Sequence, residues 1–328
     1  MRGSEMEGFD AKWRDVPHYI NGITHDIWEA RRIGSLKQYY GEGLIVRSPA
    51  SIVEGNDGII AATMATLAEF PDRALLGEDV IWCPAPGGFL SSHRLICTAA
   101  HLGDGAYGPA TGRALEYRIL ADCYCTQGAV VDEWLVRDQS AIVEQMGFDL
   151  VDWTRAQIAR EGGPGACVKP FTPARDIQGP YRGTGNDHAH GAALAEVLTR
   201  AMSADFSFFS KRYDRAASLH YPGHVTSNGP SGADRFWLPL RSAFPSATFK
   251  IHHAIGRDDA ILPPRAAVRW SLNGKHDGHG RFGTPTGAEV HVMGITHAEF
   301  GPWGLRREWT LIDDTAIWRQ ILLATGDF

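Results

Sequence analysis

The amino-acid sequence predicts an α+β protein built from two similar domains in tandem. Three observations support this prediction: an internal repeat, the order of elements within each copy, and the length of 328 residues. That length suits about two domains of roughly 150 residues each. In each copy, helical patterns come first and a run of antiparallel strands follows. This order is typical of helices gathered on one face of a curved sheet.

The repeat joins residues 107–145 to residues 282–320 at a constant displacement of 175 positions. The matching pairs include Gly108 and Gly283, Thr111 and Thr286, Gly112 and Gly287, Glu133 and Glu308, Trp134 and Trp309, Asp138 and Asp313, and Gln145 and Gln320. Two copies with so long a period indicate two like domains and exclude a solenoid of short repeats.

The chain divides at the places where its composition changes. The expected divisions are a flexible N-terminal arm over residues 1–16, a first domain over 17–158, a linker over 159–190 and a second domain over 191–328. The linker is dense in glycine and proline, and so long a stretch without periodicity is uncommon inside one compact domain. The linker either marks a domain boundary or covers a pocket, and in the second case its residues Tyr181 and Arg182 would face that pocket.

Runs rich in β-branched and aromatic residues predict four main strands in each half. In the first half they cover residues 74–84, 89–101, 114–124 and 130–137; in the second half they cover residues 248–254, 266–272, 289–300 and 305–312. A hairpin turn is expected at residues 126–128, and a helix that ends before Phe70 is expected to begin at Asn56 or Asp57.

Composition argues against several classes of function. The net charge is −6, and no run of like charge is present, so neither a nucleic acid nor a membrane is expected as a partner. No apolar run reaches the roughly 18 residues of a transmembrane helix. The five cysteines lack the spacing of a disulfide framework. They are expected to be reduced thiols in a cytoplasmic protein.

Three motifs of the first half carry a resemblance to a known family. They are PATGR at residues 109–113, VVDEW at residues 130–134 and RD at residues 137–138. With the helix and strand that precede them, they resemble the SnoaL-like polyketide cyclases of the nuclear transport factor 2-like superfamily. The first half matches well from Ile20 to Gly147. The second half matches more loosely, because its hairpin turn at residues 301–304 is rearranged.

The resemblance implies that each half is a cone, in which a strongly bent sheet wraps over N-terminal helices and a pocket opens at one end. The family includes cyclases, isomerases, dehydratases, hydrolases and plain binding proteins, so it implies the reaction only weakly. In the cyclases, an aspartate on the third strand of the sheet faces the pocket as the general acid/base. The matching residue here is Asp122.

Strand alternation supports a special role for Asp122. It shares one face with Glu116, Arg118 and Tyr124, a mixed set typical of a pocket lining, whereas the opposite face is mostly apolar. A carboxylate in such a cleft would have a raised pKa that suits proton transfer. His93, on the neighbouring strand, is its expected catalytic partner. The alternative is a structural ion pair of Asp122 with an arginine.

The second copy has a histidine where the first has Asp122. His297 shares a face with His291 and Glu299. The pair His297 and Glu299 could act as general acid and base near neutral pH. Alternatively, His297, Glu299 and His253 could bind a divalent metal, or the histidines could be structural. The other expected substrate contacts are Arg94, Arg118, Tyr124, Tyr40, Arg47, His291, Trp134 and Trp309.

These observations lead to one functional hypothesis with two rivals. The hypothesis is a small-molecule enzyme that performs cofactor-independent acid/base chemistry, such as cyclisation, isomerisation, dehydration or hydrolysis, on a polar organic substrate. The rivals are a non-catalytic metabolite-binding protein and a metal-dependent enzyme centred on the histidines of the second half. The two domains are expected to form an intramolecular pair, with a further homodimer as an option.

Overall fold

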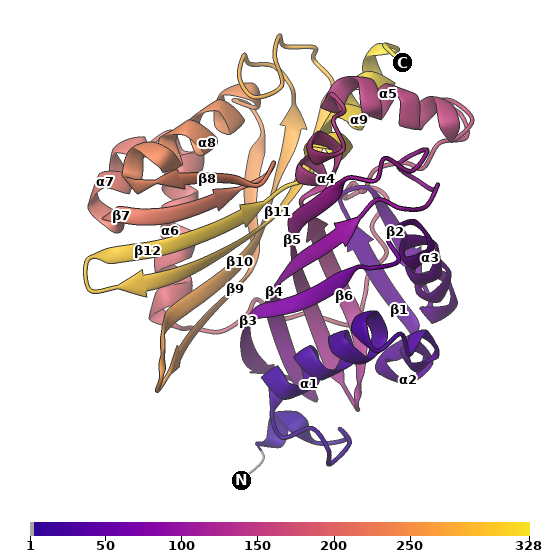
Figure 1. The fold of residues 1–328 in the computed structure, drawn as a ribbon. Helices are drawn as coiled ribbons and strands as arrows, with labels where there is room; N and C mark the ends of the chain where they lie inside the picture. The colour runs from indigo at the N-terminus through magenta and orange to yellow at the C-terminus, as the bar shows by residue number, and fades with distance from the viewer. Residues whose placement is uncertain (1–2) are drawn as a thin grey trace.

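The computed structural model describes residues 3–328 and contains two domains with the same sheet topology (Figure 1). Each sheet has six strands, in the order β2-β1-β6-β5-β4-β3 in the first domain and β8-β7-β12-β11-β10-β9 in the second. All neighbours are antiparallel except β1 with β6 and β7 with β12. The predicted α+β class with tandem, mainly antiparallel curved sheets is therefore confirmed.

The elements of the first domain follow the expected order of helices and then strands. They are η1 (Ser4–Met6), α1 (Val16–Thr24), η2 (His25–Glu29), η3 (Ile33–Ser35), α2 (Leu36–Tyr39), β1 (Tyr40–Ser48), β2 (Ser51–Glu54), α3 (Asn56–Glu69), β3 (Ala74–Ala85), β4 (Gly88–Ala100), β5 (Ala114–Thr126), β6 (Ala129–Arg137), α4 (Gln139–Gln145) and α5 (Leu150–Arg160). The four predicted strands correspond to β3–β6. The expected turn lies between β5 and β6, where Gln127 and Gly128 both have positive φ, as a tight hairpin requires.

The second domain repeats the order. Its elements are α6 (Ala189–Met202), η4 (Phe206–Phe208), α7 (Phe209–Arg212), β7 (Tyr213–Tyr221), β8 (Val225–Asn228), α8 (Gly229–Ala243), β9 (Thr248–Asp259), β10 (Leu262–Lys275), β11 (Glu289–Gly301), β12 (Gly304–Leu311) and α9 (Asp314–Thr325). Asp138 and Asp313 accept hydrogen bonds from backbone N–H groups at the start of α4 and α9. Both aspartates therefore cap the closing helices.

The N-terminal arm is packed rather than flexible over its described part. Met6, Phe9 and Trp13 are buried in the cluster that α1 forms with the sheet. The ring of Phe9 lies 4.8 Å from that of Tyr19 and 5.3 Å from that of Phe89. Three large apolar side chains removed from water hold the arm in place. Residues 1–2 of the expected arm lie outside the described residues.

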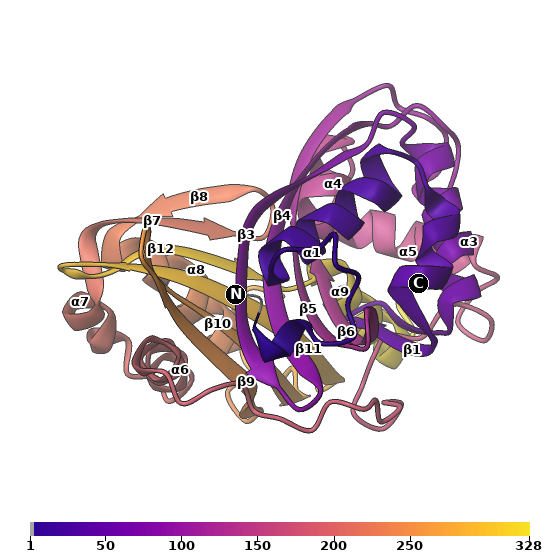
Figure 2. The ribbon, with the colours of Figure 1, turned by 90° about the horizontal axis from the view of Figure 1, so that it is seen from below.

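The two sheets pack against each other through the faces that their helices leave open (Figure 2). One apolar cluster joins Leu120 and Val136 of the first domain to Met293, Ile295 and Leu311 of the second. A second cluster joins β3, β4 and β5 to β9 and β10. Both faces of each central strand are therefore buried, one inside its own cone and the other at the junction of the domains.

The linker crosses this junction as an ordered strap. The N–H of Phe171 donates to the carbonyl of Pro49, and the N–H of Tyr181 donates to Asp132 at 3.0 Å. Farther along, Gly185 forms a bridge with Ala254 of β9. Polar contacts therefore tie the strap to both domains.

The interiors of the two cones differ. The second cone is filled by one continuous hydrophobic cluster that includes residues of α6, α8, β7, β10, β11 and β12. The first cone holds two separate clusters, one around α1 and one around α4. The inner face of the sheet between them carries buried polar side chains, and these define the candidate site described below.

Candidate functional site

The face of β5 that carries Asp122 is turned toward the second domain and not into the first cone. Apolar side chains on the opposite face, such as Cys123 and Cys125, pack against α1 inside the cone. The alternation was predicted correctly, but the face that was expected to line the pocket of a cone lies at the junction of the domains. The reason is that the domain junction buries the polar face as completely as the cone buries the apolar one.

Asp122 is the centre of a buried network between the domains. Its carboxylate accepts a hydrogen bond from the hydroxyl of Ser92, and its other oxygen lies 2.7 Å from Nε2 of His253. The Ser92 oxygen lies 2.7 Å from Nε2 of His297. Asp122, His253 and His297 are at most 1% exposed. A chain of three hydrogen bonds thus joins β4 and β5 to β9 and β11.

The protonation states of this network follow from burial and contacts. Burial opposes the charge of Asp122, but the ring of His253 and the hydroxyl of Ser92 outweigh it and lower the pKa of Asp122. Burial lowers the pKa of both His253 and His297. Both Nδ1 atoms are buried without a partner in the described chain. Neutral rings with the proton on Nε2 fit this pattern, so the network is one carboxylate held by donors.

The remaining predicted contacts of β4, β6 and β12 also lie at the junction. The guanidinium of Arg94 stacks on Trp309, and that of Arg269 stacks on Trp134. Arg94 also donates to Glu78 at 3.0 Å. These side chains hold the two sheets together.

Other predicted contacts anchor the strap or its surroundings. Arg47 donates to Asp132 and to Asp176 of the strap, at 2.5 Å each. The ring of Tyr124 lies 5.2 Å from that of Tyr181. His291 has its ring 5.4 Å from Phe171, and its Nδ1 lies 3.2 Å from the Asn273 side chain.

The structure does not bring His297, Glu299 and His253 together as a metal site. Glu299 accepts from Arg307 at 2.9 Å and borders an open groove of about 570 Å³ on the second domain. Across the described chain, the set of three side chains that could share a metal ion is His188, His190 and Asp258. That set lies at the start of α6 and the end of β9, outside both cones.

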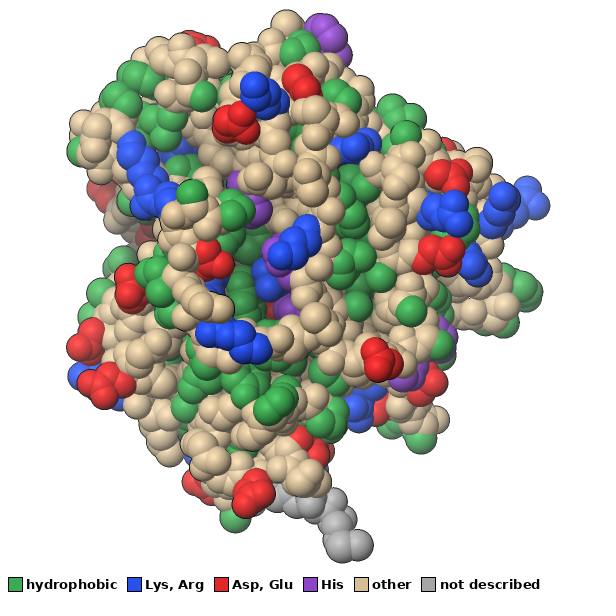
Figure 3. Space-filling model, turned by 180° about the vertical axis from the view of Figure 1, so that it is seen from behind, with side chains coloured by type: hydrophobic (Ala, Val, Ile, Leu, Met, Phe, Trp, Pro, Cys, Tyr) green, Lys and Arg blue, Asp and Glu red, His purple; other side chains and the backbone are tan. Residues whose placement is uncertain are grey.

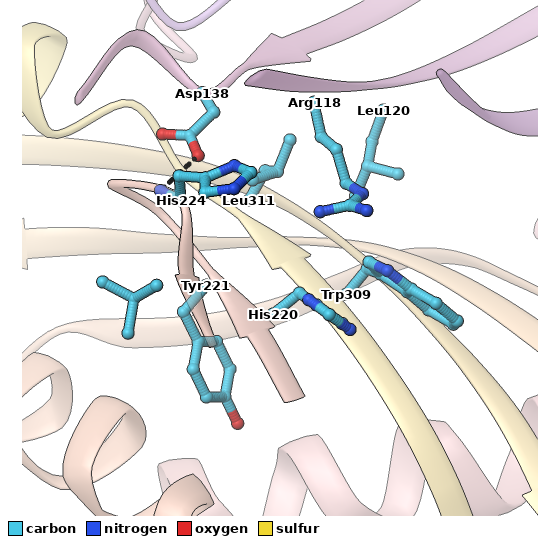
Figure 4. A pocket seen from close by; sticks show the side chains of 9 residues that line it. Arg118, Leu120, Asp138, His220, Tyr221, His224, Trp309 and Leu311 are labelled. Carbon is cyan, nitrogen blue, oxygen red and sulfur yellow. Dashed lines mark hydrogen bonds between the residues drawn. The ribbon is translucent and has the colours of Figure 1, made fainter. Parts of the chain in front are cut away.

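A small cavity lies between the domains beside Arg118 (Figure 4). Its other labelled walls include His220, Trp309 and Asp138, whose carboxylate accepts the N–H of His224 at 3.0 Å. Its volume is about 10 Å³, which is room for about one water molecule. It has polar walls but no room for an organic substrate.

The surface seen from behind carries acidic and basic side chains interspersed, without a continuous basic stripe on that face (Figure 3). A hollow near its middle contains histidine and basic side chains. No helix in residues 3–328 is long and apolar enough to cross a membrane. All five cysteines are free and buried.

Inside the second cone, Glu308 is surrounded by donors. Its carboxyl oxygens accept from Tyr213 at 2.5 Å, Thr310 at 2.7 Å, Trp237 at 3.2 Å and Tyr221 at 3.3 Å. Burial raises its pKa, while these hydrogen bonds oppose the rise. A carboxyl with all its acceptor sites filled, in a cone packed by one continuous cluster, is a structural group.

Glu133 occupies the equivalent position inside the first cone, but most of the residues that donate to Glu308 have no equivalent donor there. When the two sheets are aligned by register, Tyr40 takes the place of Tyr213, but Ser48 replaces Tyr221 and Leu135 replaces Thr310. When α3 and α8 are aligned on the Phe-Pro pair that follows each helix, Thr63 replaces Trp237. Glu133 is 6% exposed, and its Oε2 has no partner in the described chain. Burial raises the pKa of Glu133 to about 7, and Tyr40 opposes the rise. Glu133 is therefore poised to exchange a proton near neutral pH.

His93 projects into the same cone and has no equivalent in the second, where Val268 stands. It lies beside Ala121 in the sheet, while Glu133 lies beside Cys123 one strand farther on. The two strands are about 10 Å apart, at roughly 4.8 Å per step. Burial lowers the pKa of His93 to about 4, although Asp122 opposes this, so the ring is neutral at pH 7. Its Nδ1 has no partner among residues 3–328.

His93 and Tyr40, which sequence reasoning singled out, lie inside the first cone with Glu133, which it did not single out. The repeat of Glu133 as Glu308 was interpreted as scaffold. The sequence signal that could have identified Glu133 is the absence of equivalent donors around it; for example, Leu135 stands where the second copy has Thr310. The donors come from β7, α8 and β12, so only the structure shows that they converge on one carboxyl.

Comparison with known proteins supports the family at the level of one domain. Residues 192–321 match the family model of the SnoaL-like polyketide cyclases. The sequence was expected to match better in its first half, so the location of this match differs from the expectation. No curated protein matches the chain significantly.

Several solved structures are similar to the chain over one domain. IdmH of Streptomyces antibioticus, a candidate polyketide cyclase, is 19% identical, with 40% of this chain and 97% of that chain covered and a TM-score of 0.36. TsrD of Streptomyces laurentii is 16% identical, with 42% and 98% covered and a TM-score of 0.36. A SnoaL-like polyketide cyclase of Agrobacterium tumefaciens is 16% identical, with 40% and 97% covered and a TM-score of 0.33.

Two six-stranded sheets with the same strand order give each half of the chain the same α+β fold. Residues 192–321, which match the SnoaL-like family model, include the whole sheet of the second half, and the first half repeats the same sheet order.

Proposed function

We propose that the first cone is a catalytic pocket in which Glu133 transfers a proton to or from carbon next to a carbonyl group of a small organic substrate. The observation that supports this most directly is the contrast between Glu133 and Glu308. Two equivalent carboxyls lie in equivalent cones, and one has lost three of its four donors and has a pKa of about 7. A base with that pKa works most efficiently near neutral pH.

The neighbours of Glu133 suit this chemistry. Tyr40 can donate to the carboxylate when Glu133 has lost its proton. His93, neutral and on the other side of Ala121, can donate a hydrogen bond to the oxygen on which an enolate charge develops. Cyclisation of a carbonyl compound and isomerisation of an enone both begin with such a proton abstraction. The second cone, with its filled interior, acts as a structural partner.

The test follows the proton at carbon. Wild-type protein is incubated in D₂O with a panel of β-keto esters and enones, and NMR measures the incorporation of deuterium next to the carbonyl. We expect catalysed exchange with at least one compound, and a rate at least 100-fold lower for Glu133→Gln. Glu308→Gln, assayed only if it folds, and Asp122→Asn serve as controls outside the first cone. Equal rates for wild type and Glu133→Gln would exclude this role.

A further inference from the structure

Two arginine side chains enter the first cone beyond Glu133. Arg73 follows α3 and is 2% exposed, and Arg137 ends β6 on the same inner face as Glu133. Across residues 3–328, no carboxylate oxygen lies within 4.0 Å of either guanidinium. The Nη1 of Arg73 and the Nε of Arg137 are buried without a hydrogen-bond partner among the described residues. Both groups therefore have unused donors.

The contacts that these side chains do make are with neutral groups. The Nε of Arg73 donates to the sulfur of Cys97 at 3.2 Å, and its guanidinium lies 4.4 Å from the ring of Trp28. Arg137 lies within hydrogen-bonding reach of Tyr107. None of these contacts neutralises a charge.

The two guanidiniums converge on one place in the cone. Cys97, whose sulfur accepts from Arg73, lies beside Tyr117 in the sheet, and Arg137 lies beside Ile119, two residues from Tyr117 on the same face. The buried carboxylate of Glu69 is already engaged: it accepts the backbone N–H groups of Ala106 and Tyr107 and contacts His101. It has little capacity left for the arginines.

The fold itself does not require the charge of Arg137. At the equivalent positions of the second cone, the displacement of 175 puts Leu272 for Cys97, Val292 for Tyr117 and Ile312 for Arg137. All three of those residues belong to the continuous apolar cluster that fills the second cone. The same architecture is therefore stable with an apolar interior.

An unpaired buried cation is strongly destabilising unless a counter-ion reaches it. Arginine is also the side chain that best recognises a carboxylate, through two parallel N–H donors. We propose that the first cone binds the carboxylate group of a small organic acid at Arg73 and Arg137, with the rest of the molecule extending toward Glu133. This inference rests on the proposed function for the position of the reacting carbon, but the anion site stands on its own geometry.

Isothermal titration calorimetry tests the site with acetate, benzoate and cinnamate, each compared with its neutral amide. We expect at least one carboxylate to bind saturably, and its amide to bind at least tenfold more weakly. Arg73→Met and Arg137→Met should each weaken the carboxylate at least tenfold. The matched control is Arg306→Gln, an arginine paired with Asp214 on the second domain, which should leave the affinity unchanged. Binding of no carboxylate, equal binding of the amide, or full affinity in both methionine variants would overturn the proposal.

Stability without ligand gives an independent readout. Methionine has nearly the volume of arginine and no charge, so Arg137→Met should raise the melting temperature of the ligand-free protein. A lower melting temperature would mean that the cation is structural and would overturn the proposal. Glu133→Gln should keep carboxylate affinity within twofold of wild type. The exchange assay therefore tests the proton-transfer proposal, and calorimetry tests the anion-binding proposal, so either proposal can be overturned without the other.

Discussion

The guanidinium of Arg94 lies 3.5 Å from the ring centroid of Trp309, in the other domain. The reciprocal pair repeats this contact, because Arg269 lies 4.2 Å from the ring of Trp134. Each member of the second pair is displaced by 175 residues from its equivalent in the first. The junction is thus self-complementary, as in a two-fold dimer of identical subunits.

The Arg94–Trp309 contact should contribute measurably to the stability of the pair of domains. A double-mutant cycle with Arg94→Met and Trp309→Leu, measured by urea unfolding, should give a coupling energy of about 1–2 kcal/mol, since the charge is desolvated. A comparison cycle with Arg212, whose side chain is half exposed and whose guanidinium lies 5.0 Å from the ring of Phe208, should give only about 0.5 kcal/mol. A coupling near zero for the buried pair would contradict this.

The two repeated glutamates should respond in opposite ways to removal of charge. Glu308→Gln puts an amide where donors converge, so one donor loses its acceptor, and the free energy of unfolding should fall by about 2 kcal/mol. Glu133→Gln removes a buried carboxylate with few donors and should leave stability at pH 8 equal or higher. Urea unfolding at pH 8 measures both. Equal losses in the two variants would show that Glu133 is as well satisfied as Glu308.

The raised pKa of Glu133 predicts a pH dependence of stability. The folded carboxyl titrates at about 7, and its ordinary value is 4.5, so the folded state binds more protons between these values. The free energy of unfolding should therefore fall as the pH rises from about 4.5 to 7, by on the order of 3 kcal/mol from this group. The difference in stability between wild type and Glu133→Gln, measured across this range, isolates it. A constant difference would contradict the raised pKa.

Restoring one lost donor should shift the pKa of Glu133. Leu135→Thr copies Thr310, whose hydroxyl donates to Glu308 at 2.7 Å. A hydroxyl beside Glu133 would stabilise its charged form and lower its pKa. The pH midpoint of deuterium exchange should move at least about half a unit toward acid. Val136→Thr, on the opposite face of the same strand, is the control. The same shift in both variants would mean that the effect is not local.

Asp122 should matter for stability rather than for turnover. In Asp122→Asn an amide donor faces the Nε2 proton of His253, so one hydrogen bond of the buried network is lost. The free energy of unfolding should fall by about 2–3 kcal/mol, whereas Asp152→Asn on the exposed side of α5 should change it little. Deuterium exchange by the folded variant should stay within about threefold of wild type. A loss of activity as large as that of Glu133→Gln would show that Asp122 takes part in the reaction.

The sequence by itself determined the architecture of this protein. The displacement of 175 residues between Trp134 and Trp309 indicated two similar domains, and the alternation along β5 placed Asp122 and Cys123 on opposite faces. These features are local or periodic, so they are visible in one chain without coordinates. The same periodicity also placed His93 on a strand beside that of Asp122.

Only the tertiary structure decided which face of β5 lines the cone. Fusion of the domains buries both faces, so polarity no longer separates inside from outside, and Asp122 was assigned to the pocket although it meets His253 and His297 at the junction. The state of Glu133 was equally hidden. Its pKa depends on which distant side chains reach its carboxyl, and that is set by the packing of helices and strands over the cone rather than by any motif around Glu133.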